Sequence, residues 1–513
     1  LSSRRDCPFL VGNFQLLLSM NREGEIVATC SKHYPTHYPR PHCVEQYPLD
    51  WWKAVVEGLR YIVEQIPAEF VEGLGLSGHM TALVYVDQNL EPLRPSMMIA
   101  DTRSIRETEW LRQNERERCR KKTGNDPIEA FSVSKLLWIK QHEPELIRNS
   151  RWILFAKDYI RAKLTGQIAT DPTDAGNSLL TDIHTRQWDT EWVKSLGLPL
   201  EWLPPILEPD RIAGWVTEEA ARETGLKHGT PVVVGGADMA CSQIGSGALE
   251  PTTLQITLST SGQVVFRLPS VLYEEIGRIT HHMSAIKDSL YGMGTIFTGG
   301  LGAEWVYRML FQDNPAADID WDHFRQTFTR LDNDVTGHNG ILFFPFLDGS
   351  GSPYFDPVDR GAFLGLTSAH TKLDMLRAVL EGISFHIRES VEIYRRHHPN
   401  VQRITVGAGG SGNDFWCQML ADVIGLPIER LVHKDASAVG AALLAAIGIG
   451  WFDNLEQASS QIVKTADKFL PRETHKSVYD DMYAQYLSLY PRMNSIFKQM
   501  KNEKERNDVW SSI

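Results

Sequence analysis

The sequence predicts an α/β protein of two large domains. The chain has 513 residues, more than one hydrophobic core usually serves. Segments with strand character alternate with helical ones for most of this length, a pattern typical of helices layered on largely parallel sheets. After Gly247 a new series of short β-rich runs begins, as if the second half restarted the plan of the first. We therefore expect a cleft between two domains.

Short β-rich pairs open each half of the chain. NFQLLLSM and EIVATC flank residues 21–24, and GLGLSG and ALVYVD flank residues 79–81, so each pair is expected to form a hairpin or adjacent strands. In the second half, LQITLSTSGQVVF carries two such runs around residues 259–262. These segments predict sheets that begin with hairpin-like units.

Apolar residues recur at helical spacing from about Pro48 to Gln65 and from Leu373 to Tyr394, which predicts two amphipathic helices. The small-residue run ASAVGAALLAAIGIG predicts a further helix that packs closely on its sheet. Together these segments divide the chain into an N-terminal domain of residues 1–248, a C-terminal domain of residues 249–470 and a charged helical tail of residues 471–513.

Composition and charge narrow the class of partner. With 64 acidic and 52 basic residues the net charge is −12, which argues against nucleic acid and favours small-molecule chemistry. Six cysteines without a CxxC pair are typical of reduced thiols. No stretch reaches the roughly 18 apolar residues of a membrane span, and the opening LSSRRDCPFLVG lacks a signal-peptide core. We expect a cytoplasmic protein without a membrane partner, and we leave a homodimer open.

Three segments carry candidate chemistry. The strand-like run from Thr230 to Gly236 leads into Gly-Gly-Ala-Asp at residues 235–238, which places Asp238 at the end of a strand, where α/β folds bind ligands. An aspartate that only forms a turn beside glycines would give the same pattern. Residues 259–262, Ser-Thr-Ser-Gly, offer hydroxyl and backbone donors for a phosphate, or form an ordinary turn. A strand, glycines and a helix follow one another in ITVGAGGSGNDFWCQMLADVIG, where a nucleotide phosphate could approach a helix N-terminus.

The same glycines leave a second function open. Gly407, Gly409 and Gly412 match G-x-G-x-x-G, and Glu429 follows at about the spacing of a ribose-binding carboxylate. An NAD-dependent dehydrogenase is therefore a weak alternative. It is weak because a lone match of this motif is common by chance, and because this one lies far into the chain, within one half of the apparent repeat.

Taken together, the motifs resemble the FGGY family of carbohydrate kinases, most closely its xylulokinase branch. The resemblance covers most of residues 20 to 465 and is carried by GLSGHMTALVYVD, IADTRS, AKDYIRAKLTGQIATDPTDAG, GTPVVVGGADMACSQIGSG, LFFPFLDGSGSPYFDPVDRGAFLGLT and GAGGSGNDFWCQMLADVIGLPI. It implies an α/β fold of two actin-like (ribonuclease H-like) domains with the active site in the interdomain cleft. It also implies ATP and Mg²⁺ as cofactors, and phosphorylation of a ketose, polyol or sugar acid.

The resemblance also implies roles for individual residues. Asp238 falls at the catalytic aspartate, which accepts the proton of the attacking hydroxyl and acts on the metal only indirectly, through Mg-ATP. The family's sugar pocket maps to His79, Met80, Thr81, Asp101 and Met239. The nucleotide phosphates would lie beside Thr260, Ser261 and Gly262. Adenosine or ribose would be bordered by Gly300, Gly409, Gly410 and Asn413.

Departures from the family pattern keep an alternative function open. Where the family has a D-x-G-T turn beside the phosphates, the aligned stretch reads Phe-Leu-Val-Gly at residues 9–12, without a carboxylate. A pseudokinase that binds sugar or nucleotide with little turnover is therefore an alternative. Thr81 replaces the histidine usual in xylulokinases, Met239 replaces an asparagine, and Ser259 stands where glycine is usual, which indicates a changed sugar preference and a reshaped phosphate turn.

Overall fold

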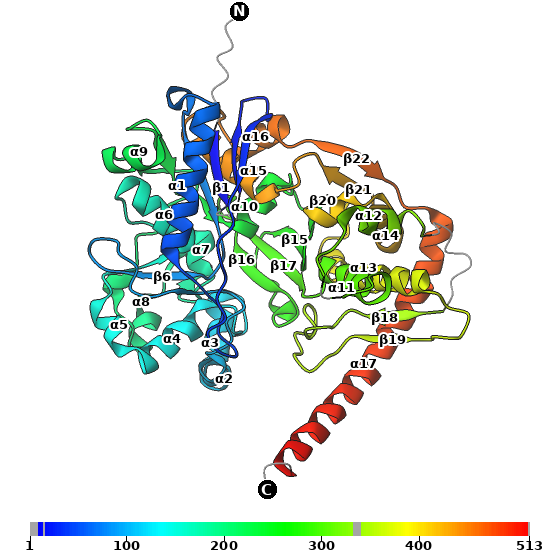
Figure 1. Cartoon of the computed structure of the whole chain (residues 1–513). Coiled ribbons are helices and arrows are strands. Elements are labelled where there is room, and N and C mark those ends of the chain that lie inside the picture. The colour runs from blue at the N-terminus through cyan, green and yellow to red at the C-terminus, as the bar shows by residue number, and fades with distance from the viewer. Residues whose placement is uncertain (1–8, 14–15, 316, 332–339, 511–513) are drawn as a thin grey trace, which may run out of the picture.

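The computed structural model describes residues 9–13, 16–315, 317–331 and 340–510. Its main elements are two mixed sheets, each packed between helices (Figure 1). The strand order of the first sheet is β11-β12-β5-β1-β2-β3, with β13 paired to β5. These strands are β1 (Phe9–Asn13), β2 (Leu16–Met20), β3 (Ile26–Ser31), β5 (Leu74–Gly78), β11 (Ile212–Trp215), β12 (Pro231–Val233) and β13 (Gly236–Ala237).

The second sheet repeats the plan of the first. Its order is β16-β17-β15-β14-β20-β21-β22. In each sheet antiparallel strands lead into two parallel pairings, β1–β5–β12 or β14–β20–β21, and an antiparallel strand then closes the edge. The strands are β14 (Thr253–Leu258), β15 (Gly262–Leu268), β16 (Thr280–Met283), β17 (Leu290–Ile296), β20 (Arg403–Gly407), β21 (Ile428–Leu431) and β22 (Thr465–Phe469).

This repeated plan confirms that the second half restarts the first, and it corrects one expectation. The sheets are mixed and not largely parallel, because each begins with a run of antiparallel strands joined by short connections. Four two-stranded pairs complete the β structure: β4 (Glu45–Gln46) with β7 (Ser96–Met97), β6 (Leu83–Val86) with β8 (Trp152–Phe155), β9 (Thr181–Asp182) with β10 (Gln187–Trp188), and β18 (Leu342–Phe344) with β19 (Ala362–Leu364).

Both amphipathic helices are confirmed. The first, α1, begins at Pro48, where proline suits the first helical turn, and buries Trp51, Val55 and Leu59 on one face. The second, α13, begins one residue earlier than expected, at Lys372, after a capping box formed by Thr371 and Asp374, and it ends three residues later, at His397.

The helices are α1 (Pro48–Gln65), α2 (Ile105–Asn114), α3 (Arg116–Thr123), α4 (Ser132–His142), α5 (Pro144–Asn149), α6 (Ala156–Thr165), α7 (Pro172–Gly176), α8 (Thr190–Ser195), α9 (Glu218–Thr224), α10 (Asp238–Gly245), α11 (Gly300–Phe311), α12 (Trp321–Phe328), α13 (Lys372–His397), α14 (Asp414–Ile424), α15 (Ala436–Gly448), α16 (Leu455–Ile462) and α17 (Glu473–Trp510). Short 3₁₀ turns are η1 (Ala68–Phe70), η2 (Leu200–Trp202), η3 (Tyr273–Glu275) and η4 (Gly409–Gly412). Among the described residues, no helix is long and apolar enough to cross a membrane.

The pair expected around residues 79–81 is not a hairpin. Strand β5 lies inside the first sheet, between β1 and β12, whereas β6 pairs with β8 elsewhere. A β-carbon at Gly75 would lie 2.1 Å from the carbonyl oxygen of Ala441, so glycine lets α15 pack directly on this buried strand. The chain leaves β5 through Thr81, whose φ is +67°. Residues 79–81 therefore stand at the carboxyl end of a central strand.

Helices α10 and α15 pack against each other between the two sheets. A β-carbon at Gly440 would lie 1.8 Å from the Cys241 carbonyl oxygen, and one at Gly245 would lie 1.9 Å from the Ala436 carbonyl oxygen. Helix α15, which the small-residue run forms, thus packs closely on α10 as well as on the first sheet, although α15 belongs to the second half of the sequence. Because the halves interlock here, the domain limits at residues 248 and 470 stay a prediction.

Helix α17 follows β22 and extends from the body at its C-terminal part (Figure 1). It is more than a charged tail. Tyr479 and Tyr486 are buried in the apolar core of the second half of the chain. Asn494 donates to the carboxylates of Asp356 and Asp359. The first part of α17 is therefore an integral layer of the second half.

Candidate active site

Asp238 and His79 leave the first sheet side by side. In the parallel pairing of β13 with β5, Gly236 lies opposite Ser77 and Ala237 lies opposite Gly78. Asp238 and His79 are the next residues of the two strands. Because parallel strands end at the same edge of a sheet, both side chains stand where α/β folds bind ligands.

The Asp238 carboxyl is tuned to titrate near neutral pH. It is half-buried at the first residue of α10, and one carboxylate oxygen accepts a hydrogen bond of 2.7 Å from the Met239 N–H. Desolvation by the surrounding protein raises its pKa to about 7, and the nearby charge of Asp435 acts in the same direction. A carboxylate with this pKa is well matched to accept a proton at neutral pH.

A pH dependence follows from this pKa. Since a general base acts in its ionised form, kcat is expected to fall about tenfold for each unit of pH below about 7. Asp435→Asn removes a repelling charge, so it should move this acid limb to lower pH. Initial rates of ADP formation at saturating substrates between pH 5 and 9 measure both effects. An acid limb near pH 4 in the parent enzyme would contradict the assignment.

The other residues expected around a sugar differ in their surroundings. Met80 and Met239 contact the same apolar cluster as Ala237, directly before Asp238. The Thr81 hydroxyl is buried and has no hydrogen-bond partner among the described residues, while its backbone carbonyl accepts from Ser132. His79 is half-buried, and burial lowers its pKa. A neutral imidazole thus stands opposite Asp238 at the strand ends, and an unused hydroxyl follows it two residues later in the chain.

Asp101 is held by protein groups on all sides. Its side chain is fully buried, with both carboxylate oxygens bonded to the Arg103 guanidinium and one of them also accepting from the Val44 N–H at 2.7 Å. Arg103 in turn bonds Glu45 at 2.7 Å. The sugar contact assigned to Asp101 stays a prediction, and in this conformation Asp101 orients Arg103.

The Ser-Thr-Ser-Gly segment forms the tight turn between β14 and β15. The Ser259 N–H donates to the Ser261 carbonyl at 3.0 Å, and the Gly300 N–H donates to the Ser259 carbonyl at 2.6 Å. A β-carbon at Gly300 would lie only 2.8 Å from that carbonyl, so glycine at the start of α11 allows the close contact. Thr260 is left exposed at the tip of the turn.

A cavity of about 1020 Å³ lies next to this turn. Five of the expected nucleotide residues line it: Thr260, Gly300, Gly409, Gly410 and Asn413. Ser261 and Gly262 are not among its lining residues. Ser261 instead accepts a hydrogen bond from Gln263, and Gly262 is buried at the start of β15. The structure thus gathers residues that are about 150 positions apart in the sequence around one large cavity.

Further residues line this cavity that were not expected from the sequence. Trp321, Phe324 and Phe328 of α12 form an aromatic wall. The cation Lys434, after β21, lies next to the glycine turn, where a β-carbon at Gly412 would be 3.0 Å from its Nζ. Aromatic faces suit stacking on a flat ring, and a cation suits phosphate. In sequence the aromatic residues resemble core positions of a helix. Lys434, by contrast, stands at the carboxyl end of a strand of the parallel part, which is a signal that sequence alone offered.

The dehydrogenase alternative loses its acidic residue. The Glu429 carboxylate pairs with Arg403 at 2.9 Å and with Lys468 at 3.1 Å on neighbouring strands of the second sheet. Glu429 is also not among the residues that line the cavity. A carboxylate used in this way bridges strands and does not bind a ribose.

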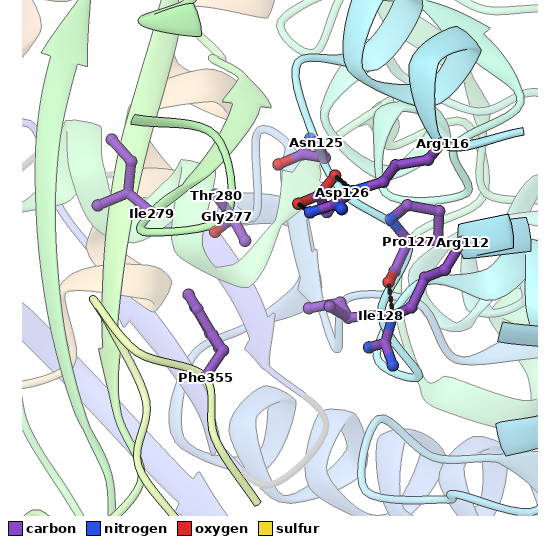
Figure 2. A pocket seen from close by; sticks show the side chains of 10 residues that line it. All are labelled: Arg112, Arg116, Asn125, Asp126, Pro127, Ile128, Gly277, Ile279, Thr280 and Phe355. Carbon is purple, nitrogen blue, oxygen red and sulfur yellow. Dashed lines mark hydrogen bonds and ion pairs between the residues drawn. The ribbon is translucent and has the colours of Figure 1, made fainter. Parts of the chain in front are cut away.

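A smaller cavity of about 220 Å³ lies between the two halves of the chain. Figure 2 shows Arg112 and Arg116 on one side of it and Ile279, Thr280 and Phe355 on the other. Its cations are already bonded, Arg116 to Asp126 and Arg112 to the Pro127 carbonyl oxygen. Asn125, which also lines the cavity, donates to the His281 carbonyl and accepts from the His281 N–H. These contacts tie the halves together.

The aligned counterpart of the D-x-G-T turn is a strand. Residues 9–13 form β1, which pairs with β2 from Phe9 opposite Met20 to Asn13 opposite Leu16. The following residues 14–15 lie outside the described part of the chain. At residues 9–12 the backbone is therefore engaged in the sheet.

This architecture defines the class of two-domain kinases. The two sheets share one plan, a carboxyl with a pKa of about 7 stands at the edge of the first sheet, and a glycine-rich cavity lies at the edge of the second. Comparison with known proteins identifies the family. The N-terminal domain model of the FGGY family of carbohydrate kinases matches residues 14–245, and its C-terminal domain model matches residues 255–449. The chain belongs to this family. It has two actin-like (ribonuclease H-like) domains, as expected, and it is a carbohydrate kinase.

Individual relatives agree with this assignment. Over 485 residues the chain is 31% identical to the xylulose kinase of Bacillus subtilis (strain 168), covering 94% of this chain and 96% of that one. It is 30% identical over 474 residues to the xylulose kinase of Staphylococcus xylosus, covering 92% and 96%. The crystal structure of a xyloylose kinase from Brucella ovis superposes with a TM-score of 0.86 at 27% identity, covering 96% of this chain and 99% of that one.

Proposed function

We propose that this carbohydrate kinase transfers the γ-phosphoryl group of ATP to a hydroxyl of a small ketose, polyol or sugar acid in the cytoplasm. Asp238 is the general base that accepts the proton of the attacking hydroxyl. The observation that carries this role is a half-buried carboxyl with a pKa of about 7 that stands beside His79 at the end of two parallel strands. Met80, Thr81 and Met239 border the sugar.

The cavity of about 1020 Å³ is the proposed ATP site. Its volume and its aromatic wall suit a purine nucleotide, and Thr260 and Lys434 are the lining groups suited to its phosphates. Among the described residues no group of three or more metal-binding side chains occurs. The Mg²⁺ ion would arrive on the phosphates of ATP, and Asp238 would act on it only indirectly, through Mg-ATP. When bound, the ion would neutralise phosphate charge.

Thr81 and Met239 are the proposed determinants of sugar preference. Thr81 is a β-branched residue held at positive φ, an uncommon conformation that histidine tolerates better. The double change Thr81→His and Met239→Asn introduces two polar groups beside Asp238. It is expected to raise kcat/KM for xylulose by roughly fivefold or more, the effect of about one hydrogen bond. A fall in kcat/KM for xylulose with unchanged ATP kinetics would contradict this assignment.

The test of the proposed function is ADP release from Mg-ATP across a panel of ketoses, polyols and sugar acids, with Asp238→Ala as control. Sugar-dependent release that vanishes in the variant supports the kinase reaction and identifies its acceptor. Measurable ATP binding without sugar-dependent release would favour the pseudokinase alternative. Selective binding of NAD would favour the dehydrogenase.

A further inference from the structure

A cluster of five charged side chains is buried beside the strand that leads to Asp238. Each member is fully inaccessible to solvent: Lys157, Asp158, Arg161, Asp171 and Asp174. The Lys157 ammonium lies 2.7 Å from Asp158, 2.7 Å from Asp171 and 3.0 Å from Asp174, and the Arg161 guanidinium lies 2.7 Å from Asp158. The proposed sugar and nucleotide residues do not include any of them.

The charged groups of the cluster face one another. Burial raises the pKa of Asp174 well above its ordinary value. Lys157 stays charged because the pKa of its ammonium is raised by the surrounding carboxylates despite its burial. The cluster thus pairs two cations with three carboxyl groups. Such a cluster contributes little net stability over apolar packing, and a geometric role accounts better for its presence.

The cluster holds both ends of the turn that precedes Asp238. Arg161 donates to the Val234 carbonyl at 2.9 Å. At the other end, the Ala237 N–H donates to the Thr173 hydroxyl oxygen at 2.7 Å, and that hydroxyl donates to Asp171 at 2.5 Å. The same Asp171 oxygen accepts from the Thr173 N–H at 2.7 Å, at the start of α7.

The turn between these anchors has little freedom. Gly235 has a φ of +78°, and a β-carbon there would lie 2.2 Å from the Leu76 carbonyl oxygen. A β-carbon at Gly236 would lie 3.3 Å from the Thr173 hydroxyl oxygen. The backbone therefore passes directly over Thr173. The Ala237 N–H, the last backbone donor before Asp238, is bonded to this side chain.

We propose that Thr173, held in turn by Asp171 and Lys157, is a positioning residue that fixes the backbone from which the Asp238 carboxylate projects. This inference rests on the proposed role of Asp238. Loss of the hydroxyl leaves the Ala237 N–H and one Asp171 lone pair unsatisfied in a dry interior. The turn then shifts, and a displacement of about 1 Å at a reacting group can lower the rate about 10²-fold.

The test compares Thr173→Ser, Thr173→Cys and Thr173→Val by sugar-dependent ADP release. Serine keeps the hydroxyl and is expected to stay within about twofold of the parent kcat. Cysteine, nearly equal in size to serine but a weak acceptor, and valine, which has no hydroxyl, are expected to lose about 10- to 100-fold in kcat. KM for ATP should be unchanged, because Thr173 does not line the nucleotide cavity.

A pH profile separates positioning from a purely structural role. When the turn loosens, water reaches the Asp238 carboxyl and its pKa falls from about 7 toward its ordinary value, so the acid limb of kcat moves to lower pH. The Thr173 variants do not alter the other titratable groups around Asp238, which are Asp435 at the N-cap of α15, Tyr291 on β17, Cys241 on α10 and His79 after β5.

Thr224→Val is the matched control. It removes a buried hydroxyl that bonds the Ala220 carbonyl within α9, and it should lower stability without changing kcat or the acid limb. A Thr173→Cys enzyme with the kcat and pH profile of Thr173→Ser would overturn the proposal, as would a lower kcat with an unmoved acid limb. If Thr173→Val does not fold, the comparison of kcat and the acid limb between Thr173→Ser and Thr173→Cys still tests the proposal. Full activity in Asp238→Ala would instead refute the role of Asp238 itself.

Discussion

Replacing Asp238 with asparagine is expected to lower kcat for sugar phosphorylation by about 10²- to 10⁴-fold, the range that a positioned general base contributes. Asparagine has nearly the same shape, and its carbonyl oxygen can still accept the 2.7 Å hydrogen bond from the Met239 N–H. It cannot accept the proton of the attacking hydroxyl. Because Asp238 does not line the nucleotide cavity, KM for ATP should change little. Coupled detection of ADP with saturating sugar measures both quantities.

Stability provides the control for this variant. The pKa of Asp238 is raised from 3.8 to about 7, so the folded protein prefers the protonated carboxyl and loses stability as the pH rises through this interval. Asp238→Asn removes that loss and is expected to raise Tm at pH 8 while changing it little at pH 4. Asp288→Asn, at an exposed turn, should alter neither activity nor Tm. An inactive Asp238→Asn enzyme with a lower Tm at pH 8 would point to misfolding.

Most of the fold could be predicted because its signals are local. The apolar spacing of α1 and α13, the hairpin around residues 259–262 and the restart after Gly247 all follow from neighbouring residues. The pairing of β5 could not be predicted from neighbouring residues, because its partners β1 and β12 are far away in sequence. Which strands meet depends on packing, here on the glycine at position 75 that admits α15.

The site was predictable to a similar degree. Family motifs led to Asp238 and to the glycines of the cavity, and the structure brings five of the seven expected nucleotide residues to one cavity wall. The aromatic wall from α12 was not predictable, since Trp321 and Phe324 have the spacing of ordinary core residues. The hydrogen bond from the Val44 N–H to Asp101 and the one from the Ala237 N–H to Thr173 join residues far apart in sequence, so no local pattern encodes them.

Gly409→Leu is expected to weaken ATP binding at least roughly tenfold, equivalent to about 1.4 kcal/mol, without destabilising the protein. Gly409 is exposed in the wall of the large cavity, and a β-carbon there meets no atom within 4 Å. A leucine side chain therefore enters the space that the nucleotide would fill. KM for ATP should rise while KM for the sugar stays near the parent value, and Gly409→Ala should give an intermediate result. Isothermal titration with ATP and steady-state kinetics measure these effects.

The neighbouring Gly410 supplies the matched comparison. A β-carbon at Gly410 would lie 2.8 Å from that of Leu258 and 3.2 Å from the Trp416 ring, so Gly410→Ala disturbs packing inside the protein. This variant should lower Tm, whereas Gly409→Leu should leave Tm unchanged. Variants of the two adjacent glycines are thus expected to differ: Gly409→Leu changes ATP affinity, and Gly410→Ala changes stability. If Gly409→Leu keeps the parent affinity for ATP, the nucleotide binds elsewhere, and the cavity of about 1020 Å³ is not its site.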